Sequence, residues 1–198
     1  MTDVLVGPAG TVVAARLLAH WWSRPTPEEV DGWSGSWPDA RRVAGSLGLD
    51  PLDVEELERA ADSPAGSLAE EYERLFVGPG RVPCSPYEAL WREDGPRRER
   101  GSVMGTATQE VIRLYGELGL AVRHDAHELA DHVAVEWEAL AYALEAGSPV
   151  AEPLLGDHLA VWLPAFCARV EQEAGHDFYR ALARATPAFA EGLARSGG

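Results

Sequence analysis

The sequence predicts an all-α protein of roughly eight to ten helices. Apolar residues recur three and four positions apart along most of the chain, which is the spacing of one helical face. Prolines and glycines stand between these periodic segments, where helices begin and end. No stretch shows the alternation of apolar and polar residues that is typical of a β-strand. Because 198 residues with 46% hydrophobic composition can bury one core, we expect a single globular domain over residues 1–198.

Helix boundaries in the first half of the chain follow from prolines and capping residues. Pro25 and Pro27 separate a first helix from a second. Asp50 is a good N-cap, because its carboxylate can accept a backbone N–H, and a proline follows it at the first helical position. Ser67 and Glu70 form a capping-box pattern. The helices expected here are 10–22, one from residue 27, 38–48, 51–61 and one that begins at Ser67 and ends before Gly78.

A proline-rich segment interrupts the helical pattern near residues 78–101. It contains Pro79, Pro83, Pro86 and Pro96 together with a run of charged residues. A loop of this length is uncommon in a compact domain and is usually functional or disordered. The helices expected after it are 102 or 106 to 118, 125–145, 153–174 with a kink or a split at Pro164, and 177–195.

Charge and cysteine content exclude several classes of function. The net charge of −15 argues against nucleic acid as a partner, since a phosphate backbone is bound by cationic side chains. No apolar run is long enough to insert into a membrane, and Asp3 stands where a signal peptide would carry positive charge, so we expect a cytoplasmic protein. Cys84 and Cys167 lie far apart without metal-ligand spacing, which fits a reducing compartment.

Six ionisable residues crowd into nine positions before a long apolar segment. One alternative is a mononuclear metal site through His124, Glu128 and His132. The structural alternatives are helix capping by Asp125 and Glu128, and a hydrogen-bonded pair of Asp131 and His132 that fixes the loop to the helix. No Glu-x-x-His motif recurs on two helices, so a di-iron site is not expected. The six residues are His124, Asp125, His127, Glu128, Asp131 and His132.

The helix expected at 125–145 has two apolar faces. One face carries the stripe that includes Trp137, and the opposite face begins at the polar cluster and continues through Val135, Ala139 and Tyr142. This second face needs a cover, which the proline-rich loop, another helix or a bound peptide could provide. Since neither a nucleophile elbow nor a phosphate-binding glycine loop is present, the pattern favours recognition over catalysis.

Four sequence motifs occur in the order that is typical of one protein family. They are Glu71-Tyr72-Glu73-Arg74-Leu75-Phe76-Val77-Gly78-Pro79-Gly80, Pro86-Tyr87-Glu88, Glu128-Leu129-Ala130-Asp131-His132, and His158-Leu159 with Trp162, Pro164 and Phe166. This order resembles the TorD/DmsD family of cytoplasmic chaperones for molybdenum-containing oxidoreductases, which includes the NarJ-like proteins. The match spans roughly residues 68–170, and Ala130 stands where the family usually has proline.

The resemblance implies an all-helical chaperone without enzymatic activity, cofactor or metal of its own. Such proteins bind the twin-arginine signal peptide or the apo form of a molybdenum-cofactor oxidoreductase, assist cofactor insertion and delay export until the client has folded. The implied partners are the catalytic subunit of the client and the twin-arginine translocase, and the implied state is a monomer or a helix-exchanged homodimer. The client-binding candidates carried over by motif are Tyr72, Leu75, Phe76, Gly78, Pro86, Tyr87, Glu128, Asp131 and His132, and the structural candidates are His158, Trp162 and Pro164.

The residue chemistry supports the same function independently. A twin-arginine signal joins guanidinium groups to an apolar stretch, which an acidic surface with a half-apolar groove complements. We therefore expect the carboxylates to pair with arginines, and Leu75, Phe76 and Tyr87 to line the apolar part. Two alternatives stay open: a NarJ-like assembly factor that reads no twin-arginine signal, and a small helical metal protein or enzyme that uses the cluster at 124–132.

Overall fold

The computed structural model describes residues 8–80, 82–92, 104–121 and 129–196. The prediction of an all-α fold is confirmed, and the helices, numbered to α10, agree with the expected eight to ten. In the described part of the chain, no helix combines the length and the apolar character that crossing a bilayer requires. The helices are α1 (Pro8–Trp21), α2 (Pro27–Trp33), α3 (Trp37–Leu47), α4 (Pro51–Ala61), α5 (Ala65–Tyr72), α6 (Thr106–Glu117), α7 (Val133–Glu145), α8 (Ala151–Pro153), α9 (Ala160–Glu173) and α10 (Asp177–Ser196).

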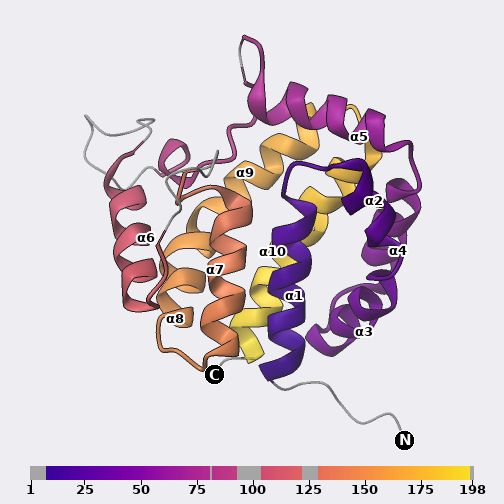
Figure 1. Ribbon diagram of the computed structural model, residues 1–198. Coiled ribbons are helices and arrows are strands. Elements are labelled where there is room, and N and C mark those ends of the chain that lie inside the picture. Colours follow the sequence, from indigo (N-terminus) through magenta and orange to yellow (C-terminus); the bar gives the residue numbers. More distant parts are fainter. Residues whose placement is uncertain (1–7, 81, 93–103, 122–128, 197–198) are drawn as a thin grey trace, which may run out of the picture.

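Helices α1 and α10 lie between two groups of helices (Figure 1). Helices α2 to α5 lie on one side, and α6 to α9 lie on the other. Within this arrangement α7 packs along α1, and α9 packs along α10. Because α1 and α7 run in opposite directions at the front of Figure 1, their junction forms a long seam on one face of the molecule.

The core is built on aromatic side chains that tie the N-terminal helices to α10. The ring of Trp33 stacks on Phe178 with 4.8 Å between ring centroids. Trp22 donates its indole N–H to the Thr186 hydroxyl at 3.0 Å, so this buried donor is satisfied. Phe76, after α5, packs edge-on against Trp22. These contacts hold α2 and the residue after α1 against α10, and the turn after α5 packs against Trp22.

The predicted helix caps are partly right. Asp50 caps α4 as expected, because its carboxylate accepts a backbone N–H of the first turn. The capping box expected at Ser67 is wrong: α5 begins directly after Pro64, and the Ser67 hydroxyl donates to the Pro64 carbonyl oxygen. The sequence contains a capping box that was not predicted, in which Thr26 and Glu29 satisfy each other's backbone N–H groups at the start of α2.

The start of α7 is a second correction. The helix begins at Val133, whereas the sequence pattern placed its N-cap at Asp125. His132 is the observed N-cap, with Nδ1 accepting the backbone N–H of Ala134 at 3.2 Å. Asp125 and its expected capping partner Glu128 lie outside the described residues. Asp131 and His132 therefore precede α7, and the expectation that they begin one of its faces is wrong.

The helix expected over 153–174 divides at a different place from the one predicted. A π-helical turn, Leu154–Leu159, joins α8 to α9, and α9 then continues through Pro164 without a break. A π turn widens the helix by one residue per hydrogen-bonded ring, and such turns often occur at functional positions. A second π turn, Glu73–Val77, follows α5 and ends at Gly78, where the helix was expected to end.

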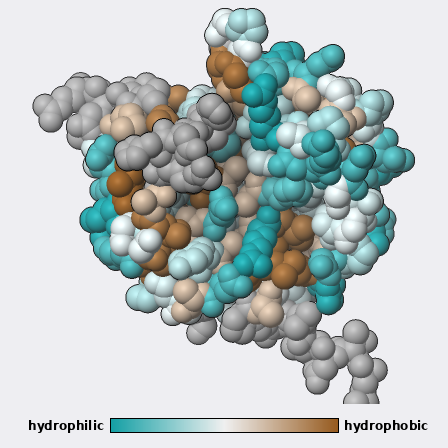
Figure 2. Space-filling model, in the orientation of Figure 1, coloured by the Kyte–Doolittle hydropathy of each residue, from teal (hydrophilic) through white to brown (hydrophobic). Residues whose placement is uncertain are grey.

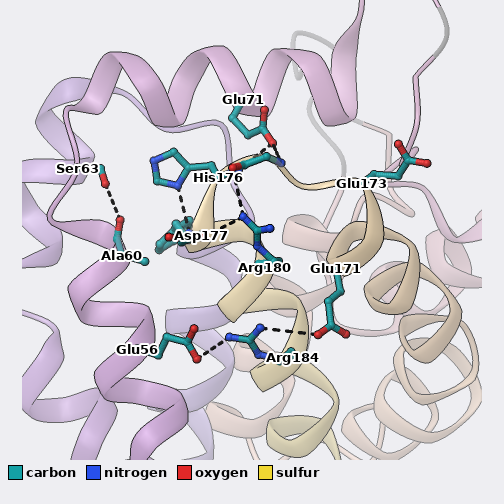
Figure 3. Close-up of polar contacts among 12 residues, drawn as sticks. Glu56, Ala60, Ser63, Glu71, Glu171, Glu173, His176, Asp177, Arg180 and Arg184 are labelled. Carbon is teal, nitrogen blue, oxygen red and sulfur yellow. Dashed lines mark hydrogen bonds and ion pairs between the residues drawn. The ribbon is translucent and has the colours of Figure 1, made fainter.

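The start of α10 is held by a carboxylate from another helix (Figure 3). Glu71 on α5 accepts the backbone N–H groups of Gly175 and His176, and it also pairs with Arg74. His176 Nδ1 in turn accepts the backbone N–H of Phe178. Burial raises the pKa of Glu71, but the hydrogen bonds from Arg74 and the two N–H groups outweigh it and hold that pKa below its usual value.

An arginine bridges three helices below this junction (Figure 3). Arg184 on α10 pairs with Glu56 of α4 at 2.5 Å and reaches Glu171 of α9 at 3.7 Å. These pairs are partly exposed, so each adds little to stability, and the aromatic core carries the packing.

Candidate functional site

The surface is hollowed where α1 and α7 run side by side, and we call this hollow the α1–α7 groove. Its volume is about 570 Å³. Figure 2 shows a line of hydrophilic residues down the middle of the same face, with hydrophobic surface beside it. The lining comes from α1 (Arg16, Ala19, His20), the adjoining Ser23 and Arg24, α7 (Ala134, Val135, Glu138, Ala141, Tyr142, Glu145), and Tyr72 and His132.

The α7 wall of the groove corresponds to the second apolar face that the sequence indicated. Val135 and Tyr142 line it, and Tyr142 is 45% exposed. Ala139 is buried in the core and does not reach the groove. Of the covers considered from the sequence, another helix lies alongside this face, because α1 forms the opposite wall.

The charges in the groove are mostly paired, with one exception. Arg16 on α1 pairs with Glu145 on α7 at 2.6 Å, and Arg24 pairs with Glu73 at 2.6 Å. Glu138 lines the groove between these pairs and forms no ion pair with any described residue. The charge that is left uncompensated in the lining is therefore a carboxylate, which favours a cationic ligand.

His132 closes one end of the groove together with Tyr72. A backbone N–H can only donate, so its contact with Nδ1 leaves that nitrogen unprotonated and puts the proton of the neutral ring on Nε2. Nε2 lies 3.4 Å from the Tyr72 hydroxyl oxygen and donates toward it. The segment of Tyr87 pairs with His132 through an isolated β-bridge, and the two rings meet edge-on. His132 is thus fixed from three sides.

Asp131 lies behind the groove and is fully buried. Its Oδ2 accepts the backbone N–H of Ala89 at 3.2 Å and the hydroxyl of Thr108 at 3.0 Å, while Oδ1 has no hydrogen-bond partner among the described residues. Burial raises the pKa of this carboxyl. In this conformation Asp131 ties the segment before Trp91 to α6 and does not face the groove.

Glu88 and His158 form a buried hydrogen-bonded pair next to Asp131. His158 Nδ1 lies 2.9 Å from Glu88 Oε2, and Arg92 donates to Oε1 of the same carboxylate at 2.7 Å. Arg92 also donates to the Asp157 carbonyl oxygen in the π turn. The structural candidate His158 therefore joins the π turn to the 3-10 turn Glu88–Leu90.

The third buried carboxylate, Glu136, was not singled out from the sequence. Trp162 donates its indole N–H to Glu136 Oε2 at 3.3 Å, and Oε1 has no partner in the part of the chain that the structure describes. Burial, followed by the nearby Glu88 carboxylate, raises the pKa of Glu136 well above its usual value. The signal in the sequence was an acidic residue beside Trp137 in an apolar helix. Together, Glu88, Asp131 and Glu136 are called the buried carboxylate cluster below.

The remaining client-binding candidates that the structure describes do not line the groove. Leu75 and Phe76 were expected to line the apolar part of the client-binding site, but both side chains are buried in the core. Gly78 ends the π turn with φ of 100°, a backbone conformation that favours glycine. The Pro86 carbonyl oxygen accepts the first backbone N–H of α7 at 2.9 Å. Glu128 lies outside the described residues.

The metal alternative falls largely outside the described residues. Of His124, Glu128 and His132, the structure describes His132 alone. Elsewhere in the described ranges, no three histidine, cysteine or carboxylate side chains are placed to hold a metal ion.

Comparison with known proteins gives consistent matches. The family model described as nitrate reductase delta subunit matches residues 49–168. The Tat proofreading chaperone DmsD of Salmonella typhi is 30% identical, with 92% of this chain and 87% of that protein covered. The chlorate reductase assembly chaperone protein of Ideonella dechloratans is 32% identical, over 69% of this chain and 70% of that protein.

A solved structure shares the fold. It is that of a proposed redox enzyme maturation protein from Archaeoglobus fulgidus, with a TM-score of 0.63, 22% identity and 94% of each chain covered. Chaperone protein TorD of Shewanella pealeana is a further relative, 31% identical over 70% of this chain and 64% of its own. The family model and the 30% identity over nearly the whole chain agree with the ordered motifs: the chain belongs to the TorD/DmsD family, which includes the NarJ-like proteins.

Proposed function

We propose that this chain is a maturation chaperone for a redox enzyme and that it holds a segment of its client in the α1–α7 groove. The names of the relatives, a Tat proofreading chaperone, TorD chaperones and an assembly chaperone for chlorate reductase, support a role in maturation. The protein acts by binding, without turnover, in the cytoplasm. Its client is the catalytic subunit of a molybdenum-cofactor oxidoreductase, held as the apo form until the cofactor is in place.

The segment that fits the groove combines arginine with apolar residues. The observation that carries this proposal is the pairing of Glu138 with Tyr142 on one face of α7, four positions apart and therefore adjacent. Glu138 offers a carboxylate that forms no ion pair with a described residue, and Tyr142 offers an exposed ring. The protein's net charge of −15 steers cationic segments toward it. A twin-arginine signal peptide has this composition.

The motif residues have two roles in the proposal. Tyr72 and His132 close the end of the groove against which the client rests, where both side chains are buried. Asp131, Pro86 and Tyr87 hold the backbone that positions His132, through the contacts of the 86–92 segment. Binding holds the client back from the translocase, and the chain works as a monomer or as a helix-exchanged dimer.

A second function is favoured by the family model that matches residues 49–168, because it carries the description nitrate reductase delta subunit. In that case the chain is a NarJ-like assembly factor that binds its client without reading a twin-arginine signal. The two functions differ in whether binding depends on guanidinium groups, which pair bidentately with carboxylates as lysine cannot.

The deciding experiment is a calorimetric titration with a synthetic peptide that carries two adjacent arginines before an apolar stretch. We expect binding that weakens when both arginines are replaced by lysine, and that weakens about two- to tenfold in Glu138→Gln. Glu110→Gln, an exposed carboxylate on α6, is the matched control and should bind like the wild type. Unchanged binding of the lysine peptide, or no binding of either peptide, would contradict signal recognition and favour the assembly factor.

A further inference from the structure

The two ion pairs of the groove differ in the position of their carboxylates. Glu73, the partner of Arg24, lies outside the groove lining, whereas Glu145, the partner of Arg16, is part of the α7 wall. Glu138 and Glu145 are seven residues apart on α7, so they lie on the same face about 10 Å from each other along the helix axis. The wall therefore presents two carboxylates to the groove, and an arginine of the protein itself occupies one of them.

We propose that Arg16 is an internal competitor for the guanidinium groups of a bound client: it occupies Glu145 when the groove is empty and gives up this carboxylate to an arginine of the client. The inference rests on the proposed function and adds a determinant of its specificity. Arg16 has the same guanidinium chemistry as the ligand, and it lies across the groove from the α7 wall on a long side chain.

The exposure of the pair makes this exchange easy. The side chains of Arg16 and Glu145 are 58% and 55% exposed, so water screens their attraction and the pair contributes little stability. Arg16 can turn toward solvent while α1 stays in place, because the buried neighbours Ala15 and Leu17 hold the helix. A client with a single arginine pairs with Glu138, and only a second arginine needs to displace Arg16.

The test is a double-mutant cycle on Arg16→Gln and Glu145→Gln, titrated with the two-arginine peptide. Arg16→Gln should tighten binding about two- to fivefold, the range that a weak exposed pair gives. In the Glu145→Gln background the same substitution should have no effect, because the contested carboxylate is gone. For a peptide with one arginine, Arg16→Gln should change the affinity less than for the peptide with two.

The control for net charge is Arg113→Gln, which removes an equally exposed arginine from the Arg113–Glu117 pair on α6. It should leave the affinity unchanged, since that pair lies outside the groove lining. Unchanged or weaker binding by Arg16→Gln would overturn the inference and leave the proposed function standing. Equal tightening with and without Glu145 would also overturn it, because the cause would then be simple repulsion. If neither wild type nor Arg16→Gln bound the peptide, the proposed function itself would fall, and the inference with it.

Discussion

Two regions of the protein contain buried or partly buried carboxylates, and burial has opposite outcomes in them. Beside the start of α10, Glu71 receives hydrogen bonds from a guanidinium group and two backbone N–H groups, and its pKa lies below its usual value. In the buried carboxylate cluster, Asp131 and Glu136 each keep one oxygen without a described partner, and both pKa values are raised. Two differences account for this: Asp131 and Glu136 are fully buried whereas Glu71 is partly exposed, and Glu71 alone of the three is paired with a guanidinium group.

The largest expected effect comes from removing the one member of the cluster that is fully paired. Glu88→Ala leaves His158 and Arg92 without their carboxylate in the interior, so the free energy of unfolding should fall by about 3 to 5 kcal/mol. Urea denaturation followed by circular dichroism measures this. Glu88→Gln keeps a hydrogen-bond acceptor, so its free energy of unfolding should fall less than that of Glu88→Ala. A loss below about 1 kcal/mol in Glu88→Ala would show that the pairing of Glu88 with His158 and Arg92 does not stabilise this region.

Glu136→Gln tests the raised pKa. A carboxyl whose folded pKa is raised supports the fold below its unfolded pKa, near 4.5, and that support is lost as pH rises through the folded value. Between pH 5 and pH 8, the free energy of unfolding of the variant should therefore rise relative to that of the wild type by at least about 1 kcal/mol. Gln retains an acceptor for Trp162. Parallel stability curves for the two proteins over this range would refute the raised pKa.

Glu71→Gln tests a pKa that is shifted in the opposite direction, below its usual value. A carboxyl with a lowered pKa stabilises the fold above its unfolded pKa, near 4.5, and the stabilisation is lost as pH falls through the folded value. At neutral pH the variant should lose about 1 to 2 kcal/mol, most of it from the bonds to Gly175 and His176, because Arg74 is 47% exposed. Thermal melts should show a smaller difference in stability between the wild type and Glu71→Gln at pH 3 than at pH 7. Glu70→Gln on the same helix is the control.

The smallest effect on stability is expected in the groove. Glu138→Gln changes an exposed carboxylate that forms no ion pair with a described residue, so its free energy of unfolding should stay within about 0.5 kcal/mol of the wild type. The same protein should bind the two-arginine peptide more weakly, as proposed above. A loss of stability as large as that of Glu71→Gln would show that Glu138 supports the fold as Glu71 does, and would contradict the contrast between the groove and the start of α10.

Local signals explain how much of the fold could be predicted. Helix α4 follows from Asp50 and Pro51 alone, since a capping side chain and a restricted φ act within one turn. Ser67 carried a similar signal and failed, because Pro64 allowed α5 to begin earlier and left the serine inside the helix. The π turns were not predicted, because no residue type in the sequence marks a change from α-helical to π-helical hydrogen bonding.

The site was harder to predict, because its contacts are distant in sequence. Asp131 was grouped with its neighbours as a client-binding carboxylate, yet its hydrogen bonds go to Ala89 and Thr108, 42 and 23 positions away. Helical projection did identify the face of Val135 and Tyr142, because those residues share one regular helix. Arg16 and Glu145, 129 positions apart, became a pair only when α1 was seen to lie along α7.

The N-cap of α7 provides a way to detect client binding through hydrogen exchange. His132 Nδ1 holds the amide of Ala134, while Nε2 points to Tyr72 at the end of the groove. A ligand that takes over the Nε2 contact leaves this amide protected, whereas one that turns or protonates the ring releases it. The hydrogen-exchange rate of the Ala134 amide therefore distinguishes a client that rests against the helix from one that begins to unwind it.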